Sequence, residues 1–151
     1  MRRHSWALAA LALTLLSGCA VGEQHRAPAE MVASVQDAGD QASSAVATVR
    51  TAVRQLGQDR ITPTVADTVQ ADSIRVLEEA TRTLTTLSPP DATVRTARDD
   101  VLDAVQAATA AVVDAGVWIT GPSAAHRQVP ENLLRELDQA WGALSIEAAT
   151  A

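Results

Sequence analysis

Phenylalanine and tyrosine are absent from this 151-residue sequence, and only Trp6, Trp118 and Trp141 supply large aromatic rings. The apolar residues are mainly 31 Ala, 16 Val and 14 Leu. A β-sandwich of this length normally places aromatic and β-branched side chains on its pleated faces. Helices tolerate small side chains, because alanine has the best helix propensity. The composition therefore argues against an all-β fold and favours helices around a core of small side chains.

Lysine is also absent, so all 12 basic residues are Arg, against 18 Asp and Glu. The net charge is −6, and without the first 18 residues, which hold two Arg, it is 10 − 18 = −8. Nucleic-acid binding needs clustered positive charge. Here the Arg residues are scattered among acids, as at Arg98 and Asp99. We therefore expect no nucleic-acid partner.

Cys19 is the only cysteine, so the chain cannot form an intramolecular disulfide. A secreted chain with one thiol must bury it, pair it with another chain or modify it. Cys19 follows an apolar run, residues 6–16, whose only polar member is Thr14 and which two Arg residues precede. Such a run is typical of a signal peptide and is shorter than the about 20 residues of a transmembrane helix. Arg2-Arg3 also suggests twin-arginine export, but the usual Ser or Thr before the pair and Phe-Leu after it are absent, so general secretion is expected.

The apolar run ends in Leu16-Ser17-Gly18-Cys19. This motif resembles the bacterial lipobox, in which an aliphatic residue and two small residues precede an obligatory Cys, and the resemblance covers the first 19 residues only. It implies that a peptidase cuts between Gly18 and Cys19 and that the Cys19 thiol carries a diacylglycerol. The alternative is an ordinary secretory signal in which Cys19 is incidental. The absence of Lys beside abundant Ala, Val, Arg and Thr resembles the codon bias of a GC-rich bacterium, and the chain as a whole resembles helical envelope lipoproteins of such bacteria.

The lipoprotein resemblance implies three segments: residues 1–18 as signal peptide, 19–27 as lipidated Cys and tether, and 28–151 as a helical bundle domain. Two acyl chains hold a protein durably on a bilayer. The mature protein would then be extracytoplasmic and anchored to the cell membrane, with membrane lipid as a partner through acylated Cys19. A second partner would be another envelope protein.

Proline divides the remainder of the chain. Pro28, Pro63, Pro89-Pro90 and Pro130 each precede a stretch of helical periodicity, and proline is favoured at the first helical position. The four stretches predict an all-α fold, an antiparallel up-and-down bundle whose fourth helix is shortest. In one alternative the last helix lies across an end of the other three. In another, residues 104–119 cross a membrane, but 16 residues are too few.

Apolar residues at steps of three and four define the expected buried faces. The first helix is expected to be followed by Gly57 as its C-terminal cap, the second to open with Thr64 as its cap, and the third to open with Ser88 as its cap. The expected buried positions, helix by helix, are Met31, Val35, Ala38, Ala42, Ala45, Val49, Ala52 and Leu56; Val69, Val76, Leu77, Ala80, Leu84 and Leu87; Val94, Ala97, Val101, Val105, Ala108, Val112 and Ala115; and Leu134, Leu137, Trp141, Leu144 and Ala148.

Residues that could carry chemistry are few. His25 and His126 have no second His or Cys nearby, so no zinc or copper site is expected. Without a Cys-x-x-Cys-His motif, covalent haem attachment is excluded, and Met31 with His126 as axial haem ligands is a remote alternative. Ser123 and His126 lie three residues apart without the Gly-x-Ser-x-Gly context of a hydrolase.

Acidic side chains cluster at Asp99, Asp100 and Asp103, where they could face a hard cation. Calcium loops also use carbonyl oxygens and a turning glycine, whereas a regular helix is expected here. These residues are interpreted as a solvated face. No catalytic, cofactor-binding or metal-binding residue is predicted, and the chain is not expected to be an enzyme.

The preferred functional hypothesis is a membrane-anchored, non-catalytic lipoprotein that serves as a helical binding module in the cell envelope. The alternative is a carrier or sensor for a small apolar ligand held between helices. An apolar patch on the outside of the helices would favour a protein partner. An internal cavity near Trp118 and Trp141 would favour a ligand.

Overall fold

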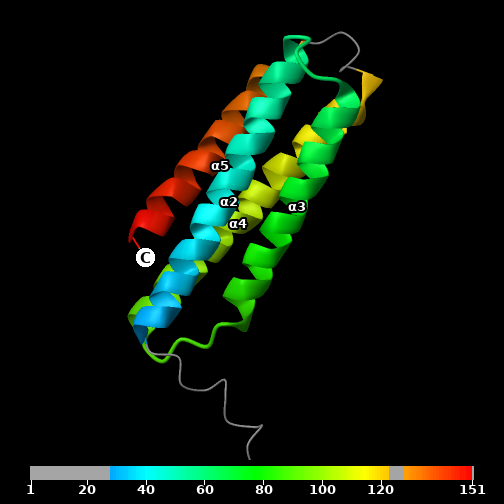
Figure 1. Ribbon diagram of the computed structural model, residues 1–151. Helices are drawn as coiled ribbons and strands as arrows, with labels where there is room; N and C mark the ends of the chain where they lie inside the picture. The colour runs from blue at the N-terminus through cyan, green and yellow to red at the C-terminus, as the bar shows by residue number, and fades with distance from the viewer. Residues whose placement is uncertain (1–27, 123–127, 151) are drawn as a thin grey trace, which may run out of the picture.

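The computed structural model describes residues 28–122 and 128–150, and within these ranges it holds four helices and no strand. They are α2 (Pro28–Gly57), α3 (Pro63–Thr86), α4 (Ala92–Thr120) and α5 (Glu131–Thr150). Successive helices run in opposite directions (Figure 1). Each contacts the next along the chain, and α2 also contacts α5. The predicted all-α fold is confirmed, and the arrangement is that of an up-and-down bundle.

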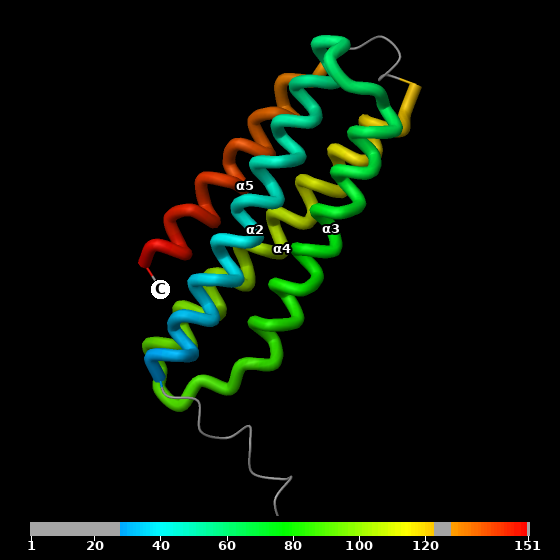
Figure 2. The backbone as a smooth tube through the Cα atoms, in the orientation of Figure 1, coloured from blue at the N-terminus to red at the C-terminus, as the bar shows by residue number. Residues whose placement is uncertain are grey.

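The fourth helix, α5, is the shortest of the described helices at 20 residues, as predicted. It lies along α2 and α4 rather than across an end of the bundle (Figure 2). The alternative that placed it across an end is therefore wrong. α4 is long and apolar enough to cross a membrane by length and composition. In the bundle, however, its buried face packs against the other three helices.

The buried face of α2 follows the predicted heptad seam without exception. All eight predicted positions are buried, and Val46 and Val53 widen the face on one side. The predicted glycine cap is wrong, because Gly57 is the last residue of the helix and no described glycine has a positive φ. The left-handed residue is Asp59, at φ 61. The chain reverses there with the Arg60 N–H donating to the Gln55 carbonyl at 2.9 Å.

Both predicted caps at helix starts lie at the wrong residue. α3 begins two residues earlier than predicted: Thr62 rather than Thr64 is its N-cap, and Pro63 occupies the first turn. α4 begins later, because its N-cap is Asp91, whose carboxylate accepts the Val94 N–H at 2.9 Å. A carboxylate satisfies a free N–H and also interacts favourably with the positive end of the helix dipole. Ser88 is exposed and lies before the helix.

On the other three helices, five of the positions predicted to be buried are not fully buried. On α3, Ala66 and Ser73 are buried, whereas Val76 is exposed and Val69 is half-buried. Burial of Ser73 is tolerated because its hydroxyl donates to the Val69 carbonyl at 2.8 Å. The remaining predicted positions that are not fully buried are Ala97, Leu134 and Trp141.

Small residues bring the helices close together. Gly39 is buried, and a Cβ atom built on it would lie 2.8 Å from the Cβ of Ala148. α2 also contacts α4 across the bundle. Close approach of this kind needs alanine and glycine at the crossing points, as the aromatic-poor composition predicts. Trp118 is buried, as expected.

Candidate functional site

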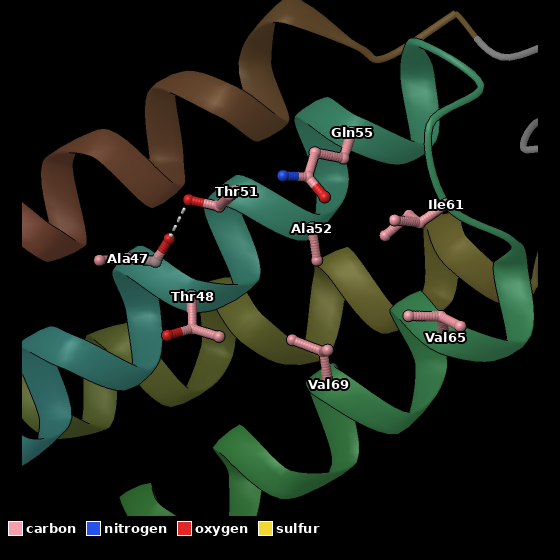
Figure 3. Close-up of a pocket in the computed structure, with 8 residues that line it drawn as sticks. All are labelled: Ala47, Thr48, Thr51, Ala52, Gln55, Ile61, Val65 and Val69. Carbon is pink, nitrogen blue, oxygen red and sulfur yellow. Dashed lines mark hydrogen bonds between the residues drawn. The ribbon is translucent and has the colours of Figure 1, made fainter.

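A groove runs along the outside of the bundle between α2 and α3. It consists of two adjoining open hollows of about 550 and 370 Å³, which share Thr48 and Val69. The hollow of about 370 Å³ lies toward the connection between the two helices (Figure 3). Residues from 40 to 55 on α2 and from 61 to 76 on the α3 side line the groove. We refer to these two hollows together as the α2–α3 groove.

The α3 wall of the groove is apolar. It carries the side chains of Ile61, Val65, Val69 and Val76. Val65 is 48% exposed and Val76 is 36% exposed. These residues form a second apolar stripe beside the buried one, because α3 turns Ala66 and Ser73 toward the core. Exposed apolar residues gathered in one groove are typical of a binding surface.

The α2 wall is less polar than its sequence suggests. The hydroxyl of Thr48 donates to the Ser44 carbonyl, and that of Thr51 donates to the Ala47 carbonyl, each at 2.8 Å. Both hydroxyl protons are thus used within the helix, in the i to i−4 pattern that Ser and Thr adopt on helices. The side chains of Ala45 and Ala52 add small apolar surface. Most of the groove therefore offers apolar contacts, and the two threonine hydroxyls do not need an acceptor from a bound partner.

Polar groups mark the two ends of the groove. Gln41 lines one end and Gln55 the other, and neither amide has a hydrogen-bond partner in the described part of the chain. Asp40 and Asp72 lie at the Gln41 end. The Asp72 carboxylate pairs with Arg75 on its own helix, and Asp40 has no ion-pair partner within residues 28–122 and 128–150. This end of the groove is consequently acidic.

A second cluster joins α2 to α5 on the other side of α2. The Arg50 guanidinium donates to Asp138 at 2.7 Å and covers the Trp141 ring, with Cζ 4.5 Å from the ring centre. Arg54 also reaches Asp138, at 3.4 Å. Trp141 is 38% exposed, so its predicted place in the core is wrong. The side chains of this cluster contact one another and connect α2 to α5.

A further hollow of about 430 Å³ lies between α4 and α5, near the end of α4. Its walls include Val117, Trp118 and Leu133, with Asp114 and Glu136 among the polar groups. Trp118 is buried, and its indole N–H has no partner among the described residues. The described residues at its rim include Pro122 and Pro130.

Five of the residues singled out in the sequence lie outside the described ranges. These are Gly18, Cys19, His25, Ser123 and His126. The structure therefore gives no geometry for lipidation, cleavage or any histidine. Met31, the other residue of the haem alternative, is buried in the core.

The acidic residues of α4 do not form a metal site in the structure. Asp99, Asp100 and Asp103 are exposed, and Asp99 pairs with Arg98 at 2.7 Å. Within residues 28–122 and 128–150, no group of three His, Cys, Asp or Glu side chains is placed to hold a metal ion.

No protein-family model, curated protein or solved structure matches this chain. The α2–α3 groove was not anticipated from the sequence. Its signal was present in Val65, Val69 and Val76, which repeat at four and seven residues. That spacing is compatible with either a buried stripe or an exposed one, and in the structure Val69 is half-buried and Val76 is exposed.

Proposed function

We propose that this chain is a lipid-anchored, non-catalytic module of the cell envelope that binds a protein partner through the α2–α3 groove. The observation that carries the proposal is the row of partly exposed apolar side chains from Ile61 to Val76. Burial of such water-exposed apolar surface by a partner is energetically favourable. The lipobox at Leu16-Ser17-Gly18-Cys19 supports the anchor.

The shape of the groove favours a protein partner over a small apolar ligand. Small-molecule sites bury most of their ligand's surface within a cleft or cavity. The α2–α3 groove is open along its length, and its walls extend over several helical turns. Such a surface can contact a long partner segment but cannot enclose a small molecule.

The position of the anchor fits a groove that faces a partner in the envelope. The eight residues 20–27 between Cys19 and α2 reach at most about 27 Å at about 3.4 Å each. The start of α2 and the α3–α4 connection lie at one end of the bundle, and the α2–α3 connection lies at the other (Figure 1). With lipid on Cys19, the Gln55 end of the groove would face away from the membrane.

Site-specific photo-cross-linking in intact cells tests the proposal. A photoreactive amino acid replaces Val65 in the groove or, as a control, Val113 on α4. The two valines are 48% and 46% exposed, so the reagent is equally accessible at both. We expect a discrete protein adduct, dependent on ultraviolet light, from position 65 and none from position 113. No adduct at position 65, or the same adducts at both positions, would contradict the proposed binding surface.

A further inference from the structure

We propose that the occupant of the α2–α3 groove is an amphipathic helix of a partner protein, with an apolar face and basic residues at the end that meets Asp40 and Asp72. This inference rests on the proposed function and specifies the chemistry of the partner. It follows from the length of the groove, the hydrogen-bonding state of its walls and its charge. Amphipathic helices that place an apolar face in an apolar groove are a common recognition mode.

The length of the groove matches a helix of about four turns. Gln41 and Gln55, which line its two ends, are 14 residues apart on one straight helix. At about 1.5 Å per residue they are separated by about 21 Å along the axis. A partner helix of similar length would place an apolar residue every three or four positions against the valines of α3. The two free amides are positioned to bind polar groups where the apolar strip ends.

The walls favour a helix because they offer few backbone partners. An extended peptide needs a row of unpaired backbone N–H and C=O groups, such as a sheet edge provides. The groove lies between two helices, whose backbone groups are bonded internally, and the Thr48 and Thr51 hydroxyls are also engaged within α2. A helix satisfies its own backbone and presents only side chains. It is therefore the form of peptide that this surface can accept without unpaired polar groups.

The charge of the groove selects a basic partner. Asp40 and Asp72 line the Gln41 end. Arg75 on α3 pairs with Asp72, so these three side chains together leave one net negative charge, that of Asp40. A second copy of this chain would bring another net charge of −8 for residues 19–151 and would be repelled. Lys or Arg residues at the corresponding end of a partner helix would be attracted. Charges at the rim of an interface contribute mainly to partner choice and association rate.

Two synthetic peptides test the inference on the full lipidated chain. Both are 18-residue amphipathic helices with the same leucine face, and one carries Lys where the other carries Glu. The chain is held in nanodiscs of neutral phosphatidylcholine, and binding of the labelled peptides is followed by fluorescence anisotropy with the signal of empty nanodiscs subtracted. We expect the Lys peptide to bind at least tenfold more tightly than the Glu peptide. Equal affinities, or no binding of either, would overturn the inference.

Matched variants separate groove binding from general attraction to an acidic protein. Val65→Asp and Val113→Asp add the same charge at valines of nearly equal exposure. We expect Val65→Asp to weaken the Lys peptide at least tenfold and Val113→Asp to change it less than twofold. Stronger or equal binding to Val65→Asp would show attraction to charge alone and would overturn the inference. Replacement of both Asp40 and Asp72 by Asn should weaken the Lys peptide and reduce its dependence on salt.

The cross-linking experiment tests the groove as a binding surface, and the peptide experiment separately tests the basic helix as its occupant. A protein adduct from position 65 without peptide binding would retain the groove as a binding surface but overturn the basic helix as its occupant. The same applies if the adduct is a second copy of this chain. If the cross-linked segment is identified by mass spectrometry, we expect a helical sequence with apolar residues at steps of three and four and a basic end. An acidic or extended segment would contradict the inference.

Discussion

The guanidinium of Arg50 covers the indole of Trp141, with Cζ 4.5 Å from the ring centre, and donates to Asp138 in the same arrangement. Asp138 and Trp141 are three residues apart on α5, so one α2 side chain contacts both. The arrangement explains why a large aromatic residue lies at the edge of the bundle. The ring packs under the guanidinium on one side and remains open to water on the other.

We expect Arg50 and Trp141 to be energetically coupled. A double-mutant cycle with Arg50→Met and Trp141→Leu should give a coupling energy of about 0.5–1 kcal/mol, the range of a partly exposed cation–π contact. Urea denaturation followed by circular dichroism measures it. As a control, the cycle is repeated with Arg75→Met in place of Arg50→Met, and no coupling to Trp141 is expected because Arg75 pairs with Asp72 on α3. Additive effects of the Arg50 and Trp141 substitutions would show that their contact does not stabilise the fold.

Two glycines should respond oppositely to the same substitution. At Gly142 a Cβ has no neighbour within 4 Å, so Gly142→Ala should raise the free energy of unfolding by about 0.5–1 kcal/mol through helix propensity. At Gly39 a Cβ would lie 2.8 Å from the Ala148 Cβ, and Gly39→Ala should lower stability by about 1 kcal/mol as overpacking outweighs propensity. Adding Ala148→Gly should relieve the clash. A stabilised Gly39→Ala variant would mean that α2 and α5 are not this close.

The start of α4 can be tested at its cap. Asp91→Ala removes the acceptor of the Val94 N–H and should cost about 0.5–2 kcal/mol. Ser88→Ala should change stability by less than about 0.5 kcal/mol, because Ser88 is exposed and outside the helix. Thermal or urea unfolding of the two variants beside the parent gives the comparison. The reverse order would restore Ser88 as the cap.

Lipidation is tested at Cys19. If the lipobox is functional, mass spectrometry of protein extracted from membranes should find an acylated Cys19 at the mature N-terminus. Cys19→Ala should release the protein from the membrane fraction or leave it unprocessed. The helical circular dichroism spectrum should remain, because every helix of the described bundle begins at or after Pro28. A mature N-terminus elsewhere, or a free thiol at Cys19, would refute the proposal.

Helical periodicity predicted the bundle well where one face of a helix is distinctly apolar. α2 is the best case, with every seam residue buried from Met31 to Leu56. On α3 the sequence offers two apolar stripes separated by about a quarter turn, one through Ala66 and one through Val65. Periodicity alone cannot choose between them, because the choice depends on how α3 is rotated against α2 and α4. The groove was missed for this reason.

The first residues of α3 and α4 and the exposure of Trp141 could not be predicted, because they depend on contacts that the local sequence does not show. Ser88-Pro89 and Asp91 are both acceptable starts in isolation, and the Asp91 carboxylate is the group that binds the Val94 N–H. Trp141 falls on the core spacing of α5, yet smaller Ala140 occupies the buried position beside it. Because α2 and α5 approach closely, little room remains between them for an indole. The Trp141 ring lies at the edge of the bundle instead, where Arg50 packs over it.

Contact between α2 and α4 across the bundle has a consequence for the way the protein opens. These two helices form a central spine of 30 and 29 residues, against which α3 and α5 each lie on one side. If either outer helix detaches, α2 and α4 still contact each other, so we expect native-state hydrogen exchange to be slowest along α2 and α4. A partner bound in the α2–α3 groove would slow exchange in α3 while leaving α5 at its original rate. The outer helix whose exchange slows would therefore show on which side of the bundle the partner binds.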